Sequence, residues 1–216
     1  MPAEIDQTPS RPAARAFGGS AVAVVVAGTV ALLTRQPWLF PSLGPAIMLH
    51  VEQPGKPESS PRNTVIGHLV ALLAAYALLV VTGLADHPSA LQEGVSGLRI
   101  VAAAGSLAVT AAVLVLLNAA HPPAGATTLI VSLGLLHTPT QLVTAFAAVL
   151  LVTLVDLLFN RATGRQMPLW RAPREREERS GAEPRSREQK GIREREERSG
   201  AEPRSREQMT TPAKEG

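Results

Sequence analysis

The sequence has no cysteine among its 216 residues. This absence excludes disulfide bonds, thiolate nucleophiles and cysteine-ligated metal sites, and the redox compartment cannot be read from thiol usage. The sequence also lacks the HExxH spacing, paired carboxylates and any serine motif typical of nucleophilic catalysis. We therefore expect no catalytic residue, no metal and no cofactor, and we do not expect an enzyme.

Charged residues are nearly absent from four long apolar runs, at residues 17–33, 64–85, 98–117 and 141–159. Each approaches the roughly 20 helical residues that cross a hydrocarbon core of about 30 Å. The first run has no small-residue cleavage site after it, so we interpret it as a retained helix and not as a signal peptide. Two shorter runs, 38–51 and 121–136, are interrupted by proline and glycine. The prediction is an all-α, polytopic transmembrane helical bundle with four long helices and two short interrupted segments.

The charge distribution divides the chain into an N-terminal cytoplasmic segment (1–16), a transmembrane domain (17–160) and a charged tail (161–216). Most lysines and arginines lie in the tail, where segment 174–189 recurs with an identical sequence at 193–208. A stretch of mixed charge with so few apolar residues cannot bury enough surface to offset its chain entropy, so we expect a disordered tail. Because interleaved glutamates cancel the field of the arginines, we expect no nucleic-acid partner.

The positions of lysine and arginine in the short loops predict the orientation, because cytoplasmic loops are enriched in these residues. The N-terminal segment, loop 52–63 and the tail carry them, whereas loop 86–97 does not. The pattern predicts six passes, arranged as 3+3 inverted repeats with both termini in the cytoplasm. We expect this arrangement in the inner (plasma) membrane of a bacterium. The alternative is a four-helix bundle with re-entrant or interfacial short runs, which places loop 86–97 inside.

Two motifs occupy the interrupted segments. One is the run from Asn118 to Thr127, which contains His121-Pro122-Pro123; the other is Pro41-Ser42-Leu43-Gly44-Pro45, followed by Pro61-Arg62-Asn63-Thr64 at the start of the next long run. Over about residues 20–160 the order and spacing of these motifs resemble the HPP family of integral membrane proteins, named for the His-Pro-Pro triplet. The resemblance implies a multi-helix membrane domain of bacterial or plastid type. It also implies nitrite transport, the activity reported for plastid and cyanobacterial members.

Physical chemistry also favours an anion site at these segments. Pro122 and Pro123 cannot donate backbone hydrogen bonds, and they hold His121 on non-helical backbone. A helix that starts near Ala124 is expected to present free N–H groups and a positive dipole end, and a helix resuming after Pro45 would aim a second positive end at the same region. The candidate substrate-binding residues are His121, Pro122, Pro123, Gly125, Arg62, Asn63, His68, Gly44 and Pro45. Arg62 is included because guanidinium pairs well with planar oxyanions.

Several of these residues also have a purely structural interpretation. His121 could be a helix cap satisfied by a carbonyl, and His68 an interfacial anchor. Asp156, in the last long run, has two interpretations: it could couple transport to protons, or it could be an acid at the membrane interface. The remaining histidines, His50, His87 and His137, fall near segment ends and are expected at the interface.

The function predicted is a transporter or facilitator of a small inorganic anion such as nitrite, embedded in the lipid bilayer. The alternative is a non-transporting membrane anchor or sensor that displays the charged tail. Small residues such as those at 102–105 allow helices to approach one another closely. The sequence leaves open whether the protein forms a homo-oligomer.

Overall fold

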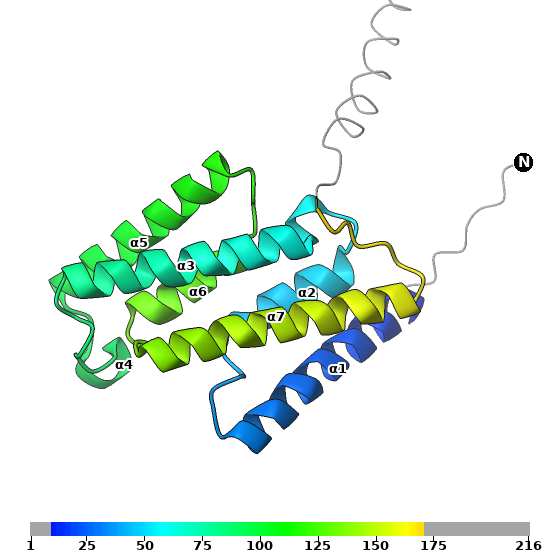
Figure 1. Cartoon of the computed structure of the whole chain (residues 1–216), viewed down its shortest axis with the longest axis horizontal. Coiled ribbons are helices and arrows are strands. Elements are labelled where there is room, and N and C mark those ends of the chain that lie inside the picture. Colours follow the sequence, from blue (N-terminus) through cyan, green and yellow to red (C-terminus); the bar gives the residue numbers. More distant parts are fainter. Residues whose placement is uncertain (1–9, 171–216) are drawn as a thin grey trace, which may run out of the picture. The chain divides into compact units, whose positions relative to one another are not determined.

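The computed structural model describes residues 10–170, and it forms only helices there (Figure 1). In chain order they are α1 (Ser10–Thr34), α2 (Leu43–Glu52), η1 (Pro57–Ser59), α3 (Pro61–Val81), α4 (Ala90–Glu93), α5 (Gly97–Leu116), α6 (Pro123–Ser132) and α7 (Pro139–Ala162). Four of them, α1, α3, α5 and α7, are long and apolar enough to cross a membrane. This confirms the predicted transmembrane helical bundle. The duplicated segments of the tail lie outside the described residues.

The long helices α3 and α7 begin and end in the same way. Ser60 and Thr138 precede a proline in the first helical position, and each side chain accepts the backbone N–H three residues on, at 3.3 Å. Both helices are followed by a glycine with positive φ, Gly83 at 71° and Gly164 at 73°. A capping hydroxyl, a first-turn proline and a left-handed glycine fix both ends of a helix locally.

Within residues 10–170 the chain runs from one end of the bundle to the other six times. The start of α1 lies beside the ends of α2 and α7, because a Cβ added at Gly19 would meet Val51 and Phe159. The start of α3 meets the end of α5, where Arg62 bonds the carbonyl of Leu117. Figure 1 shows that segments 35–52 and 117–132 each return through the bundle. This path is the one that six passes require, and the number of membrane crossings stays a prediction, since four helices are long and apolar enough to span a membrane.

The two halves of the described chain, α1 to α3 and α5 to α7, share the order long, short, long and run in opposite directions (Figure 1). Within residues 10–170, the non-glycine residues with positive φ are Arg35 (53°) and Asn118 (52°). Each follows the first long helix of its half, where the left-handed conformation ends the helix and turns the chain back into the bundle. The predicted 3+3 inverted arrangement is thus visible in the path and in its turning points.

The short helices α2 and α6 have 10 residues each. At 1.5 Å per residue each is about 15 Å long, roughly half of a hydrocarbon core. Ser42, which precedes α2, meets Thr127 of α6 with 2.6 Å between their hydroxyl oxygens. Figure 1 shows the two helices running in opposite directions with their N-terminal ends toward each other.

Small residues let the helices approach closely. Ala23, Ala75 and Ala145 are fully buried in the main apolar cluster. Within the 102–105 stretch, Ala102 is fully buried, and a Cβ added at Gly105 would lie 3.4 Å from Leu78 of α3. These small residues of α5 therefore pack inside the chain's own bundle, as close helix packing in membranes requires.

Candidate functional site

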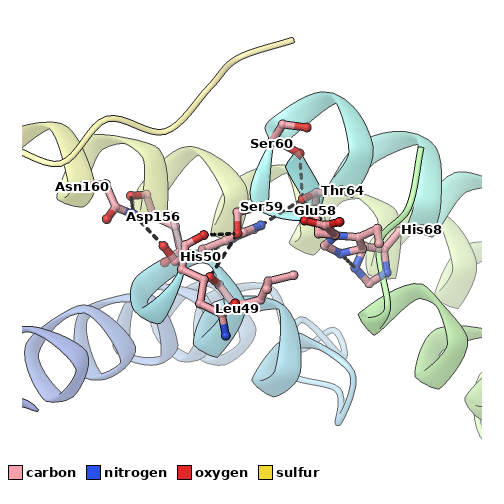
Figure 2. Close-up of polar contacts among 11 residues, drawn as sticks. Leu49, His50, Glu58, Ser59, Ser60, Thr64, His68, Asp156 and Asn160 are labelled. Carbon is pink, nitrogen blue, oxygen red and sulfur yellow. Dashed lines mark hydrogen bonds and ion pairs between the residues drawn. The ribbon is translucent and has the colours of Figure 1, made fainter. Parts of the chain in front are cut away.

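The first part of the candidate site is a pair of fully buried side chains from α2 and α7. His50 Nδ1 lies 2.8 Å from Asp156 Oδ2, and both side chains are 0% exposed. Asn160, one helical turn after Asp156, donates from Nδ2 to the carbonyl of His50 at 3.1 Å and to that of Asp156 at 2.9 Å. Figure 2 shows His50 between Asp156 on one side and Thr64 on the other. A buried acid at this position is held by a partner of complementary chemistry, as intramembrane ionisable groups require.

Thr64 of α3 continues the contacts from this pair. Its hydroxyl oxygen lies 2.9 Å from His50 Nε2 and 3.1 Å from the carbonyl of Ser60 (Figure 2). The same oxygen is 3.5 Å from His121 Nδ1, and that nitrogen lies 2.8 Å from the carbonyl of Glu58. His121 sits on the non-helical segment before α6, as its two following prolines predict.

The contacts then pass to the meeting point of the short helices. His121 Nε2 lies 3.2 Å from His68 Nε2, and His68 Nδ1 lies 2.7 Å from the hydroxyl of Thr127. The Thr127 hydroxyl contacts Ser42 in turn. We call the seven residues Asp156, His50, Thr64, His121, His68, Thr127 and Ser42 the polar chain, and the exposed fraction of each is 2% or less.

Close packing of α3 on the segment before α6 holds His121 and His68 together. A Cβ added at Gly67 would lie 2.9 Å from His121 Cβ and 3.3 Å from Ala124 Cβ. Only glycine therefore allows the backbone of α3 to lie this close to His121. Of the predicted site residues, the structure brings His121 and His68 into direct contact.

Arg62 and Asn63 lie at the first turn of α3 and bind backbone carbonyls. Arg62 donates to the carbonyls of Leu117 and Asn118 at 3.2 and 3.3 Å, past the end of α5, and to Asn63 Oδ1 at 3.0 Å. Its guanidinium carbon also lies 5.7 Å from the centre of the Trp170 ring. Asn63 donates to the carbonyls of Pro57 and Ala120. Both side chains thus fasten the segment that carries His121, and Arg62 also complements the C-terminal end of α5.

The expectation of free N–H groups at the short helices is wrong. In α6, Ala124 and Gly125 donate to the carbonyls of His121 and Pro122, and in α2 the amides of Leu43 and Gly44 donate to Phe40 and Pro41. These tight first turns satisfy the amides locally, so any ligand there would meet side-chain donors. Gly44, Pro45 and Pro122 are exposed, Gly125 is half-buried, and Pro123 is buried at the start of α6. None of these five contributes a polar atom to the polar chain.

Sequence reasoning missed the role of His50. It was expected at the interface, whereas the structure buries it completely against Asp156. The last turn of α2 packs against α7, which turns His50 away from lipid and solvent. A signal was present in the sequence, because a lone acid inside a long apolar run needs a buried partner. Ser42, Thr64 and Thr127 carried no comparable signal, since hydroxyl residues are common in membrane helices.

A second polar cluster lies at the opposite end of the bundle, around Arg99 of α5. Its side chain is 0% exposed and donates to the carbonyl of Pro88 at 2.7 Å, to Glu93 Oε1 at 3.3 Å and to the carbonyl of Ser132 at 3.4 Å. Arg99 thus fastens the 82–96 loop to the end of α6. Over residues 10–170, no group of three or more His, Cys, Asp or Glu side chains is arranged to hold a metal ion.

These features define a polytopic helical membrane protein whose two inverted halves meet at a buried polar chain. The family model described as "HPP, transmembrane region" matches residues 6–168, and the chain belongs to the HPP family. No curated protein and no solved structure gives a significant match.

Proposed function

We propose that this protein transports a small monovalent anion, with nitrite as the first candidate. The observation that supports this most is the meeting of two half-length helices, N-terminus toward N-terminus, beside the buried His121 and His68. Short or interrupted helices at corresponding places in two inverted halves are typical of the central binding site of transporters. The helix dipoles favour negative charge at this meeting point, and the hydroxyl and imidazole groups supply the donors.

The proposal assigns the residues at this point to two roles. His121 and His68, with Ser42 and Thr127 beside them, would bind the anion once their mutual hydrogen bonds open during transport. Arg62, which is half-buried at the end of the bundle where α3 begins, would attract the anion to that mouth. We also propose that the protein lies in a bacterial inner membrane with its C-terminus in the cytoplasm, and that it moves its substrate without converting it.

The test is nitrite uptake into proteoliposomes that contain the purified full-length protein, compared with empty liposomes. We expect His121→Ala to reduce uptake by about tenfold or more, since it removes a buried polar partner from the site. His87→Ala is the matched control, because His87 is an exposed histidine in the 82–96 loop, with a side-chain exposure of 56%. Wild-type uptake no faster than the leak of empty liposomes would contradict nitrite as the substrate, and other small anions would then be assayed.

A truncation after residue 170 distinguishes transport from the alternative function, an anchor or sensor that displays the charged tail. A transporter should keep its nitrite uptake without the tail, because the polar chain lies wholly within residues 10–170. Loss of a cellular phenotype with unchanged uptake in liposomes would favour the display role.

A further inference from the structure

The polar chain is continuous, and the donors and acceptors along it can be assigned from chemistry alone. A backbone carbonyl can only accept, so His121 Nδ1, at 2.8 Å from the carbonyl of Glu58, carries a hydrogen. With His121 neutral, its Nε2 is an acceptor, and the hydrogen between the two imidazoles belongs to His68 Nε2. His68 Nδ1 then accepts from the Thr127 hydroxyl, and Thr127 accepts from Ser42. All these bonds therefore point in one direction, from Ser42 to Glu58.

One added proton reverses the direction of the hydrogen bonds between Ser42 and His121, and every donor still has an acceptor afterwards. A proton arriving at the Ser42 oxygen lets Ser42 pass its own proton to Thr127, Thr127 pass its proton to His68 Nδ1, and His68 pass its Nε2 proton to His121 Nε2. The result is an imidazolium at His121, with each bond of the chain formed in the opposite sense. One proton enters and one positive charge appears, so the step is balanced.

The other half of the polar chain, from Thr64 to Asp156, keeps its hydrogen bonds whether His50 is neutral or protonated. When His50 is neutral with its hydrogen on Nδ1, it donates to Asp156 Oδ2, and the Thr64 hydroxyl donates to His50 Nε2. When His50 is an imidazolium, Nε2 donates to Thr64 and the hydroxyl turns to the carbonyl of Ser60, 3.1 Å away. Thr64 can therefore act as donor or acceptor without any movement of the backbone.

The two halves join between His121 and Thr64. His121 Nδ1 is 2.8 Å from the carbonyl of Glu58 and 3.5 Å from Thr64 Oγ1, so a small rotation of the ring moves its proton from the carbonyl to the hydroxyl. Thr64 would take that proton as it gives its own to His50, and His50 would pass its Nδ1 proton to Asp156. Asp156 Oδ2, which lies 2.8 Å from His50 Nδ1, would receive this proton and then donate it back toward His50 Nδ1, while Oδ1 is buried and has no hydrogen-bond partner among the described residues.

Taking these steps together, we propose that the polar chain conducts protons between the N-terminal end of α2 and Asp156, and that it couples proton movement to anion transport. The inference rests on the proposed function. His121 links the two processes, because the imidazolium that forms there supplies a positive charge where the anion would bind. A proton moving with a monovalent anion also makes the transfer electroneutral.

No other charged side chain in the described range competes for this proton by direct contact. The titratable side chains that contact the three histidines of the polar chain are the histidines themselves and Asp156 of α7. From η1, Glu58 contributes only its backbone carbonyl. Arg62, on the first turn of α3, bonds Asn63 and the carbonyls after α5. The remaining side-chain hydrogen bonds of these histidines are with the neutral hydroxyl groups of Thr64 and Thr127.

Thr64 is the position at which the proposal can be tested most sharply. Thr64→Val keeps the shape of the side chain and removes the hydroxyl through which the two halves communicate, whereas Thr64→Ser keeps the hydroxyl. Thr64 is not among the residues assigned to anion binding. If the valine variant loses coupling and the serine variant keeps it, coupling depends on proton transfer through the hydroxyl and not on packing alone.

The experiment uses proteoliposomes of the full chain loaded with a pH-sensitive dye, and it records nitrite uptake driven by a pH gradient together with proton uptake. Exchange of labelled for unlabelled nitrite at equal pH is measured alongside. We expect wild type and Thr64→Ser to move protons with nitrite, and Thr64→Val to lose roughly tenfold or more of the gradient-driven uptake while it keeps exchange. His87→Gln serves as a control for histidine replacement outside the polar chain.

The outcomes separate the two proposals. Wild-type protein that moves nitrite without protons, or Thr64→Val with wild-type gradient-driven uptake, would overturn the proton pathway and leave anion transport standing. Wild-type protein with neither exchange nor uptake would overturn nitrite transport itself, and with it the inference. If Thr64→Val fails to give a monodisperse protein in detergent, the proton-to-nitrite ratio of wild type and Thr64→Ser decides the question.

Discussion

His50 and Asp156 are 106 positions apart in the chain and meet in the interior of the bundle, with 2.8 Å between Nδ1 and Oδ2. The contact joins the last turn of the short helix α2 in the first half to the last long helix in the second half. It therefore ties the two inverted halves together and forms one end of the polar chain. Removal of this contact should therefore lower both the stability of the protein and its transport activity.

We expect Asp156→Ala to lower the free energy of unfolding by about 3 kcal/mol, because the substitution leaves His50 buried without its charge partner. Thermal unfolding of the full chain in detergent micelles measures the effect. Asp86→Ala is the control, since Asp86 is an exposed acid in the 82–96 loop. Equal melting temperatures for the two variants would show that the buried pair contributes little to stability.

Gly67→Ala tests the close packing of α3 against the segment before α6. The new methyl group would lie 2.9 Å from His121 Cβ, an atom next to the backbone that cannot move aside cheaply. We expect a loss of about 1–3 kcal/mol of stability from overpacking, together with a displaced His121. Gly97→Ala at the start of α5, where nothing lies within 4 Å, should be close to neutral. A Gly67→Ala protein as stable as Gly97→Ala would contradict the close approach.

Arg99→Ala should release the 82–96 loop. The substitution removes the donors that hold the carbonyls of Pro88 and Ser132, and it leaves Glu93 without its arginine. We expect a cost of about 2–4 kcal/mol and faster proteolysis within the loop, because these backbone groups lose a charged, buried partner. Arg165→Ala, at an exposed arginine beyond α7, is the control. Unchanged proteolysis of the loop would show that other contacts hold it.

The six-pass path makes a topological prediction that suits a chain without cysteine. Single cysteines introduced by Gln92→Cys, in the short helix α4, and by Arg165→Cys, after α7, should react with a membrane-impermeant maleimide from opposite sides, because three passes separate these two exposed positions. The wild-type chain provides a background free of labelling. Labelling of both positions from the same side would instead require the four-helix arrangement, in which segments 35–52 and 117–132 do not cross.

Much of the architecture follows from local sequence properties. The long apolar runs predict the transmembrane helices because span length and backbone satisfaction leave few alternatives in a bilayer. Ser60-Pro61 and Thr138-Pro139 fix helix starts through contacts within a few residues, and the His-Pro-Pro triplet holds His121 off helical backbone. The positions of the two interrupted segments predicted where the halves would meet, and the structure places Ser42 and Thr127 in contact there.

Other features depended on packing between distant parts of the chain. The pairing of His50 with Asp156 requires α2 to pack on α7, and the contact of His121 with His68 requires the backbone of α3 to pass close at Gly67. The first amides of α2 and α6 are satisfied within their own tight turns, so the dipole argument alone did not predict the donors at the site. The sequence by itself determined the helices, their caps and their family. Only the tertiary structure decided which buried polar groups meet, because hydrogen bonds act over about 3 Å and their partners are chosen by how the helices pack.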